Sequence, residues 1–119
     1  MPNMSFMITP DQFLDGTKTV TRRDGWWNIK IGEVHQGVRK SQGLKKGEKV
    51  ERLGDFIPIG ARAEPLCRLL DEPEYGKQEV ILEGFPRMTP LEFVTMFLNT
   101  HKKATMSKPV NRIEFVRSF

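Results

Sequence analysis

The chain has 119 residues, a formal net charge of +4 and one cysteine, Cys67. This length suits one domain with one hydrophobic core, so we expect a single domain over residues 1–119. No apolar run comes near the roughly 20 residues of a membrane-spanning helix. The N-terminal residues lack the pattern of a secretory signal, and a lone cysteine excludes an internal disulfide. We therefore expect a cytoplasmic protein without membrane contact.

The first half of the chain predicts short strands around one short helix. An opening strand is expected over residues 5–8. Thr9 followed by Pro10 then predicts a helix start, with Gly16 as the left-handed end of that helix. Alternating polar and apolar residues predict further strands. These are expected over residues 18–22, over residues 32–39, after Gly47 through Val50 and Leu53, and once or twice within residues 56–70.

The second half of the chain predicts two helices and a closing strand. A short helix is expected over residues 75–82, and Thr89 with Glu92 forms the capping-box pattern of a second helix start. Helical spacing predicts a core-facing stripe made of Phe93, Val94, Phe97 and Leu98. The strand expected over residues 110–119 has an apolar face made of Ile113, Phe115 and Phe119. These patterns favour an α+β fold, a small mixed β-barrel with two or three short helices.

Charge is distributed unevenly along the chain. Residues 16–52 contain ten Lys or Arg residues against four Asp or Glu, whereas residues 71–92 contain six acidic residues against two basic ones. Such segregation favours a polyanion on the basic side, with Lys45 and Lys46 among its contacts. The alternative is a solvated lysine-rich loop without a ligand.

Residues 16–27 concentrate groups that suit phosphate and nucleobases. A segment that only fills a sheet needs Val, Ile and Phe, but here Val20 alone is of that kind. Cationic donors and hydroxyls suit phosphate, and flat rings suit a stacked base. The candidate contacts in this segment are Lys18, Thr19, Thr21, Arg22, Arg23, Trp26 and Trp27. For the two tryptophans, the alternative is one core residue and one residue that covers a hairpin.

An ordered set of these and later residues resembles the ASCH domain, a branch of the PUA-like β-barrel superfamily. The matching residues are Gly16, Lys18, Thr19, Thr21, Arg23, Asp24 and Trp26, the turn Ile31-Gly32-Glu33, the segment Glu83-Gly84-Phe85 and the closing Arg112-Ile113-Glu114-Phe115. The resemblance covers nearly the whole chain and implies a small β-barrel with a cleft for RNA or a nucleoside. Some members of the family remove the acetyl group from N(4)-acetylcytidine, and others have been described as ribonucleases.

The resemblance to the amidohydrolase members implies three catalytic residues, Lys18, Thr21 and Glu83. A threonine hydroxyl becomes a nucleophile when a neutral amine takes its proton. An ordinary lysine pKa of about 10.4 keeps the amine protonated at pH 7, so burial or the neighbouring arginines must lower that pKa. Glu83 would hold the attacking water or donate a proton to the leaving amine. Residues three apart on a flat strand point to opposite faces, so Lys18 and Thr21 converge only if the strand bends or bulges.

The sequence therefore predicts a protein whose cleft binds RNA or a modified nucleoside, with single-stranded DNA as a further option. The alternative is a hydrolase that uses the same residues, either an N(4)-acetylcytidine amidohydrolase or a ribonuclease. A third alternative is an adaptor that binds another protein. His35 and His101 have no partner at metal-site spacing, and no P-loop or dinucleotide motif occurs. We therefore expect no metal and no cofactor.

Overall fold

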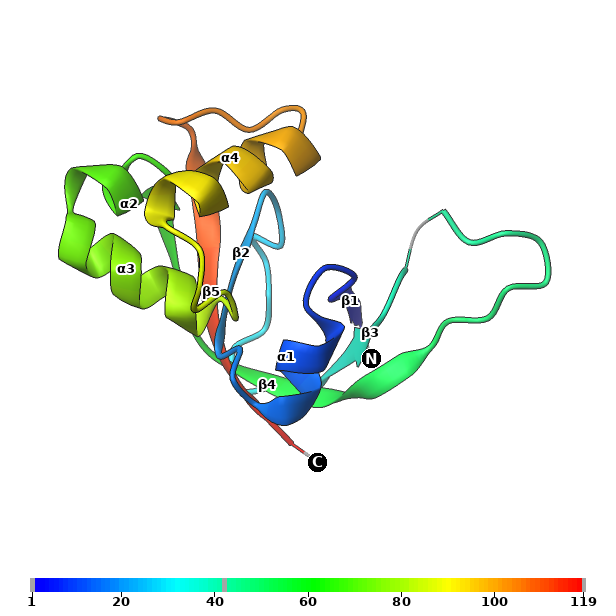
Figure 1. Ribbon diagram of the computed structural model, residues 1–119. Helices are drawn as coiled ribbons and strands as arrows, with labels where there is room; N and C mark the ends of the chain where they lie inside the picture. The colour runs from blue at the N-terminus through cyan, green and yellow to red at the C-terminus, as the bar shows by residue number, and fades with distance from the viewer. Residues whose placement is uncertain (1, 42, 119) are drawn as a thin grey trace.

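Five strands form one mixed sheet in the computed structural model, which describes residues 2–41 and 43–118 (Figure 1). The strands are β1 (Asn3–Ser5), β2 (Val20–Arg23), β3 (His35–Val38), β4 (Arg52–Pro65) and β5 (Pro109–Arg117). Their order in space is β1-β3-β4-β5-β2, with β1 parallel to β3 and the other neighbours antiparallel. No pairing between described residues joins β1 to β2, so the observed sheet is open and barrel closure is not part of it.

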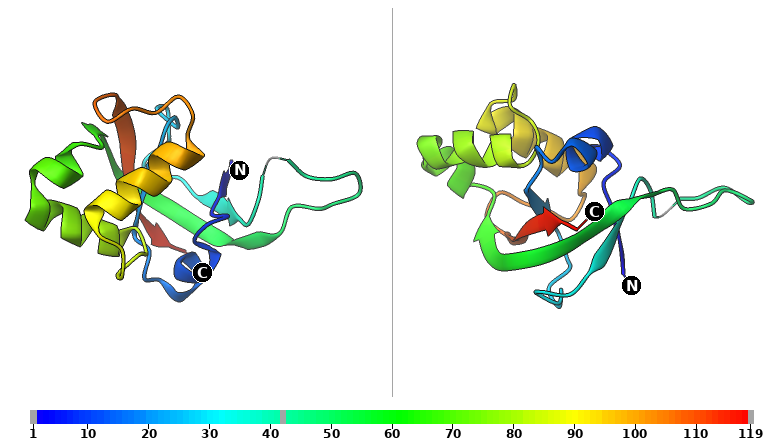
Figure 2. Two further views of the ribbon diagram at one scale, coloured as in Figure 1. Left: turned by 45° about the horizontal axis from the view of Figure 1, so that its top comes forward. Right: turned by 90° about the horizontal axis from the view of Figure 1, so that it is seen from below.

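Four helices accompany the sheet, so the predicted α+β class is confirmed with more helices than expected. They are α1 (Pro10–Asp15), α2 (Arg68–Asp71), α3 (Pro73–Leu82) and α4 (Pro90–Thr100). In Figures 1 and 2, α2, α3 and α4 gather over one end of the sheet, while α1 lies at the other end and contacts β4. No helix within the described ranges is long and apolar enough to cross a membrane.

The long strand β4 connects two separate apolar clusters. Its pairing with β5 shifts register between Pro58 and Gly60, which marks a bulge, and the strand curves beneath both halves of the molecule (Figure 2). The first cluster comprises Met4, Phe6, Phe13, Phe56, Ile113 and Phe115. The second cluster, beneath α2, α3 and α4, comprises Leu66, Leu69, Val80, Phe93, Val94, Phe97 and Val110. The domain therefore has two cores with a seam between them.

Signals at the helix ends are confirmed where the chain has to turn. Gly16 has a φ of 82° at the end of α1, a conformation that glycine adopts without steric cost. Thr89 and Glu92 form both hydrogen bonds of the capping box at the start of α4. Thr9 precedes α1 as predicted, but its side chain makes no capping hydrogen bond.

Several predicted strand boundaries are wrong. The opening strand covers Asn3–Ser5 instead of residues 5–8. The Phe6 N–H still donates to the Val38 carbonyl of β3 at 2.8 Å, and residues 7–8 leave the sheet. Residues 56–70 contribute the rest of one long strand followed by α2, because the chain turns into a helix after Pro65. The residues confirmed as buried are Phe93, Val94, Phe97, Ile113 and Phe115, whereas Leu98 is partly buried and Phe119 lies outside the described residues.

Candidate functional site

The backbone before β2 explains how Lys18 and Thr21 reach the same pocket. A strand was predicted over residues 18–22, but β2 begins at Val20. Lys18 therefore lies two residues before the strand. Its backbone N–H donates to the Gln12 carbonyl at 3.1 Å, and the N–H of Thr19 donates to the Leu82 carbonyl at 2.9 Å. Because the N–H groups of Lys18 and Thr19 bond to α1 and α3 and not to a neighbouring strand, the segment does not follow the strict alternation of side chains. Two side chains three residues apart therefore line one pocket.

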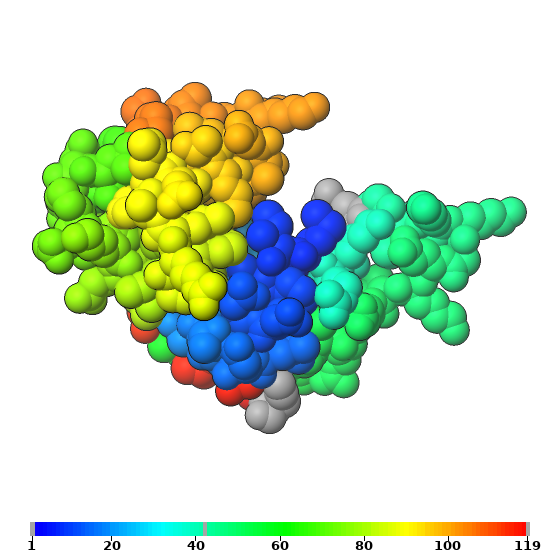
Figure 3. All heavy atoms as spheres, viewed as in Figure 1, coloured from blue at the N-terminus to red at the C-terminus, as the bar shows by residue number. Residues whose placement is uncertain are grey.

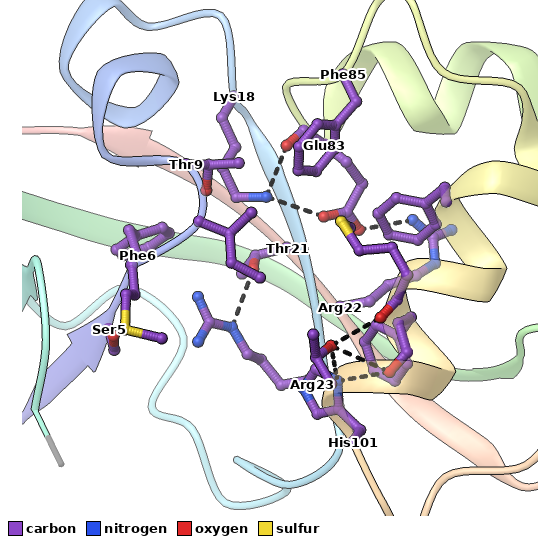
Figure 4. Close-up of a pocket in the computed structure, with 16 residues that line it drawn as sticks. Ser5, Phe6, Thr9, Lys18, Thr21, Arg22, Arg23, Glu83, Phe85 and His101 are labelled. Atoms are coloured by element: carbon purple, nitrogen blue, oxygen red, sulfur yellow. Dashed lines mark hydrogen bonds and ion pairs between the residues drawn. The ribbon is translucent and has the colours of Figure 1, made fainter. Parts of the chain in front are cut away.

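Glu83 meets Lys18 from the C-terminal end of α3 (Figure 4). The Lys18 ammonium donates to the Glu83 backbone carbonyl at 2.7 Å and to Glu83 Oε1 at 2.9 Å. Gly84 follows with a φ of 98°, and a Cβ placed there would lie 3.0 Å from the Cβ of Gln12 and 3.4 Å from that of Lys18. Gly84 therefore permits both the turn after α3 and the close approach of α3 to the segment that carries Lys18.

Lys18, Thr21, Arg23 and Glu83 line one pocket with a volume of about 240 Å³. Figure 3 shows the surface hollowed between the N-terminal segment (blue) and α4 (yellow to orange). The apolar wall of the pocket is made of Phe6, Met7, Ile8, Phe85, Phe93, Met96 and Phe97. The other lining residues are Ser5, Thr9, Arg22, Thr100 and His101. Phenylalanines of both apolar clusters contribute, so the pocket lies in the seam between the two cores.

Arg23 is the pocket cation with donors left for a ligand. Its Nε donates to the Thr21 hydroxyl at 3.0 Å, and its guanidinium lies 5.0 Å from the centroid of the Phe6 ring (Figure 4). Its Nη groups form no hydrogen bond or ion pair with any described residue. Burial lowers the pKa of Arg23 to about 10, so the guanidinium stays protonated at neutral pH. Those Nη groups are therefore suited to a carbonyl or anionic oxygen.

Arg22 belongs to a buried ion network beneath the helices. Its guanidinium binds three carboxylates at N–O distances of 2.9, 2.6 and 3.0 Å, those of Glu64, Glu79 and Glu83. Arg112 of β5 also binds Glu79, with N–O distances of 2.5 and 3.0 Å. With Lys18 included, three cations face three carboxylates, and all six residues are buried. The charge of Arg22 is thus matched within the protein, which assigns Arg22 to the network rather than to a phosphate.

Burial also changes the proton affinity of two groups in this network. Burial lowers the pKa of Lys18, which Glu83 opposes and the charges of Arg23 and Arg22 reinforce. Lys18 is therefore easier to deprotonate than an ordinary lysine. Burial alone raises the pKa of Glu79, but hydrogen bonds from Arg112 and Arg22 outweigh this and lower that pKa to about 2. Glu79 is consequently ionised throughout the neutral range.

The remaining predicted contacts do not line this pocket. The Thr19 backbone carbonyl accepts a hydrogen bond from β5, and Trp26 packs against the first apolar cluster. Trp27 is 52% exposed. Trp26 is therefore partly buried and Trp27 is exposed, and base stacking at these positions stays a prediction. Lys45 and Lys46 lie in the connection between β3 and β4.

Sequence reasoning missed the apolar wall and much of the ion network. Glu79 and Glu83 are four residues apart on one side of α3, and this spacing of two acids was the available signal. Glu64 and Arg112 carry no local signal because they meet only through the register of β4 and β5. The sequence did not indicate that Phe6 lines a pocket, because a strand was predicted through residues 5–8.

Comparison of the chain with models of known protein families, with curated proteins and with solved structures found no match. The resemblance noted from the sequence therefore stays a prediction. Within residues 2–41 and 43–118, no group of three or more His, Cys, Asp or Glu side chains is arranged to hold a metal ion. The site is interpreted from its own chemistry, which combines an amine, a hydroxyl, a guanidinium and a carboxylate beside phenyl rings.

We predict that Glu79→Gln lowers the free energy of unfolding by about 3–5 kcal/mol at neutral pH, because two buried arginines lose a counter-charge. In the wild type, the folded pKa of Glu79, about 2, lies below its ordinary value of 4.5. Ionised Glu79 therefore stabilises the fold above pH 4.5, and this contribution is lost as the pH falls toward 2. Urea unfolding at several pH values measures both effects.

Glu74→Gln is the matched control on the same helix. The Glu74 side chain is 90% exposed and lies 3.7 Å from the Lys77 ammonium. Its loss should change the free energy of unfolding by less than about 1 kcal/mol, because exposed ion pairs contribute little. Equal stability of the two variants at neutral pH would refute the structural role of the network.

Proposed function

We propose that the pocket binds one nucleobase, either of a modified nucleoside or of RNA. The observation that carries this proposal is that the amine, hydroxyl, guanidinium and carboxylate named above line the same small pocket as several phenyl rings. Flat rings pack against the faces of a base, and a few placed polar groups select its edge. A volume of about 240 Å³ suits one base rather than a stretch of several nucleotides.

The polar groups complement the edge of a pyrimidine such as cytosine. Cytosine presents an amino group that donates and a carbonyl oxygen that accepts. In the proposed complex, Glu83 accepts from the ligand, while Arg23 and Lys18 donate to it. A site for phosphate alone would need no buried carboxylate, because like charges repel. The mixed set of donors and acceptors therefore supports a base rather than a bare phosphate.

We further propose that the chain is an ASCH-type member of the PUA-like superfamily. Lys18, Thr21 and Arg23 carry the first part of the resemblance, and Glu83 carries the second part more than 50 positions later. Their meeting in one pocket supports the proposal because local sequence similarity alone does not require it. The bulged and curved strand β4 is the kind of strand that bends a sheet toward a barrel, the fold that the resemblance implies.

Binding of cytidine and N(4)-acetylcytidine, measured by isothermal titration calorimetry, tests this proposal. Arg23→Gln should weaken binding about tenfold to a hundredfold, because a hydrogen bond from a charged group contributes about 1.5–3 kcal/mol. Arg52→Gln is the control, since the Arg52 side chain is 58% exposed and pairs with Asp55 outside the pocket. Equal affinities of the two variants, or a wild type that binds neither nucleoside, would contradict the proposal.

The position of Thr21 supports a second candidate function, hydrolysis of N(4)-acetylcytidine. In this reaction, neutral Lys18 takes the hydroxyl proton and Thr21 Oγ1 attacks the acetyl carbonyl carbon. The bond from this carbon to N4 breaks as N4 receives a proton, and water then releases acetate from the threonine ester. The proton that Lys18 took from the hydroxyl goes to N4, and Glu83 either passes this proton on or holds the water. The lowered pKa of Lys18 supports this candidate.

Chromatography of N(4)-acetylcytidine incubated with the protein tests this second candidate. We expect Thr21→Val, which keeps the shape but lacks the hydroxyl, to abolish release of cytidine, and Thr21→Ser to retain part of it. The wild-type rate should rise with pH and level off above the lowered pKa of Lys18, because the neutral amine acts as the base. Cytidine release by Thr21→Val at the wild-type rate would exclude the threonine as the nucleophile.

A further inference from the structure

The connection between β3 and β4 forms a basic arm that projects from the molecule (Figures 1 and 2). We define the basic arm as residues 39–41 and 43–51. Its described residues include five cations, Arg39, Lys40, Lys45, Lys46 and Lys49, against two acids, Glu48 and Glu51. A projecting segment with so little apolar surface does not add to either core, so its charge calls for a different explanation.

Three lysines of the basic arm form no ion pair with its acids. Arg39 pairs with Glu51 at 2.6 Å, and Lys40 lies 3.5 Å from Glu48, so both acids are taken. No ion pair with a described residue involves the three lysines that remain, Lys45, Lys46 and Lys49. All three are exposed. The basic arm therefore presents a net positive charge to the solvent.

The basic arm adjoins the nucleobase pocket through Met7. A second hollow of about 200 Å³ lies between Met7 and the arm, where Lys49 is among its lining residues. Met7 also lines the main pocket and is 61% exposed. Figure 3 shows the N-terminal segment (blue) between the helical layer and the arm. The exposed side chain of Met7 thus lies between the two hollows, and Lys49 is the unpaired lysine that lines the second one.

We propose that the pocket and the adjoining basic arm together bind a single-stranded nucleic acid, with one base in the pocket and the neighbouring phosphates on Lys45, Lys46 and Lys49. This inference rests on the function proposed above, and it identifies the ligand as a polynucleotide rather than a free nucleoside. Positive grooves beside aromatic side chains are the common form of single-strand binding sites. A base stacked within a duplex cannot enter a pocket without being extruded, so the single strand is the favoured form.

Two other polyanions fit the charge of the basic arm less well. An anionic membrane would use the lysines but leave the adjoining base-sized pocket without a role. An acidic protein would leave the phenyl rings of the pocket without a role in the same way. Only a chain that carries both bases and phosphates uses the two hollows together.

The test compares three proteins by fluorescence anisotropy with a labelled single-stranded RNA of about ten nucleotides. The arm variant carries Lys45→Gln, Lys46→Gln and Lys49→Gln. The control variant carries Lys30→Gln, Lys77→Gln and Lys103→Gln, which removes the same charge from exposed positions outside both hollows. Cytidine and N(4)-acetylcytidine are titrated into each protein by calorimetry, and binding to vesicles that contain phosphatidylserine is measured alongside.

We expect the arm variant to lose RNA affinity and the control variant to keep it. Three phosphate contacts contribute about 2 to the slope of log affinity against log salt, which at about 0.1 M salt is a loss of about a hundredfold. Nucleoside affinity should be the same in all three proteins, because the pocket is untouched.

Several outcomes would overturn the inference. RNA affinity that is equal in the arm and control variants would exclude the arm as the phosphate site. RNA that binds the wild type no more tightly than cytidine would also exclude it, although nucleoside binding would leave the function of the pocket standing. Arm-dependent binding to vesicles without arm-dependent binding to RNA would assign the arm to a membrane. Arm-dependent RNA binding without any nucleoside binding would break the proposed link to the pocket.

Discussion

The guanidinium of Arg22, held among three buried carboxylates, is the interaction on which the arrangement of the site depends. Two of these carboxylates come from α3 and its C-terminal end, and Glu64 comes from the end of β4. Arg22 itself belongs to β2, so one side chain ties the edge of the sheet to the helical layer. Burying so much charge is costly unless every group finds a partner. In the network each charged side chain has at least one ion-pair partner, and the buried Nε of Arg22 is the atom left without a hydrogen bond among the described residues.

The pocket follows from this network because Glu83 serves both. One Glu83 oxygen binds Arg22, and the other binds the Lys18 ammonium. The alternation of β2 then separates the two neighbouring arginines, with Arg22 in the network and Arg23 beside Thr21. The strand β2 thus carries one arginine that stabilises the fold through the ion network and one that lines the pocket. The two apolar clusters complete the site, since their phenylalanines wall the seam in which these polar groups lie.

The sequence predicted those parts of the molecule that local chemistry determines. The capping box at Thr89 and the left-handed end at Gly16 needed only neighbouring residues. The curvature of β4, the open edge of the sheet and the meeting of Arg112 with Glu79 depend on strand register over long distances. Glu83 is an intermediate case, because a resemblance placed it in the site, whereas its four-residue spacing from Glu79 is a local signal for two acids on one side of a helix.

The roles of the individual cations also depend on tertiary structure. The sequence shows which segments are basic and which are acidic. It does not show which cations have a carboxylate partner in the folded protein and which do not. Arg22 was grouped with Arg23 as a phosphate contact, and only packing separates them. Lys45 and Lys46 were predicted as contacts of a polyanion, and they lie in the exposed connection between β3 and β4. Distinguishing these roles requires knowing which acids face each cation, and that is a property of tertiary structure.

Chemical-shift mapping of the isotope-labelled protein with N(4)-acetylcytidine tests the central claim most directly. We expect the largest shifts on the residues that line the pocket, with Thr21, Arg23 and Glu83 among them. The exposed residues Trp27 and Ile59, on surfaces outside the pocket, should not respond. Shifts confined to such outer surfaces, or no shifts at saturating nucleoside, would contradict the claim that this seam between two cores is a nucleoside site.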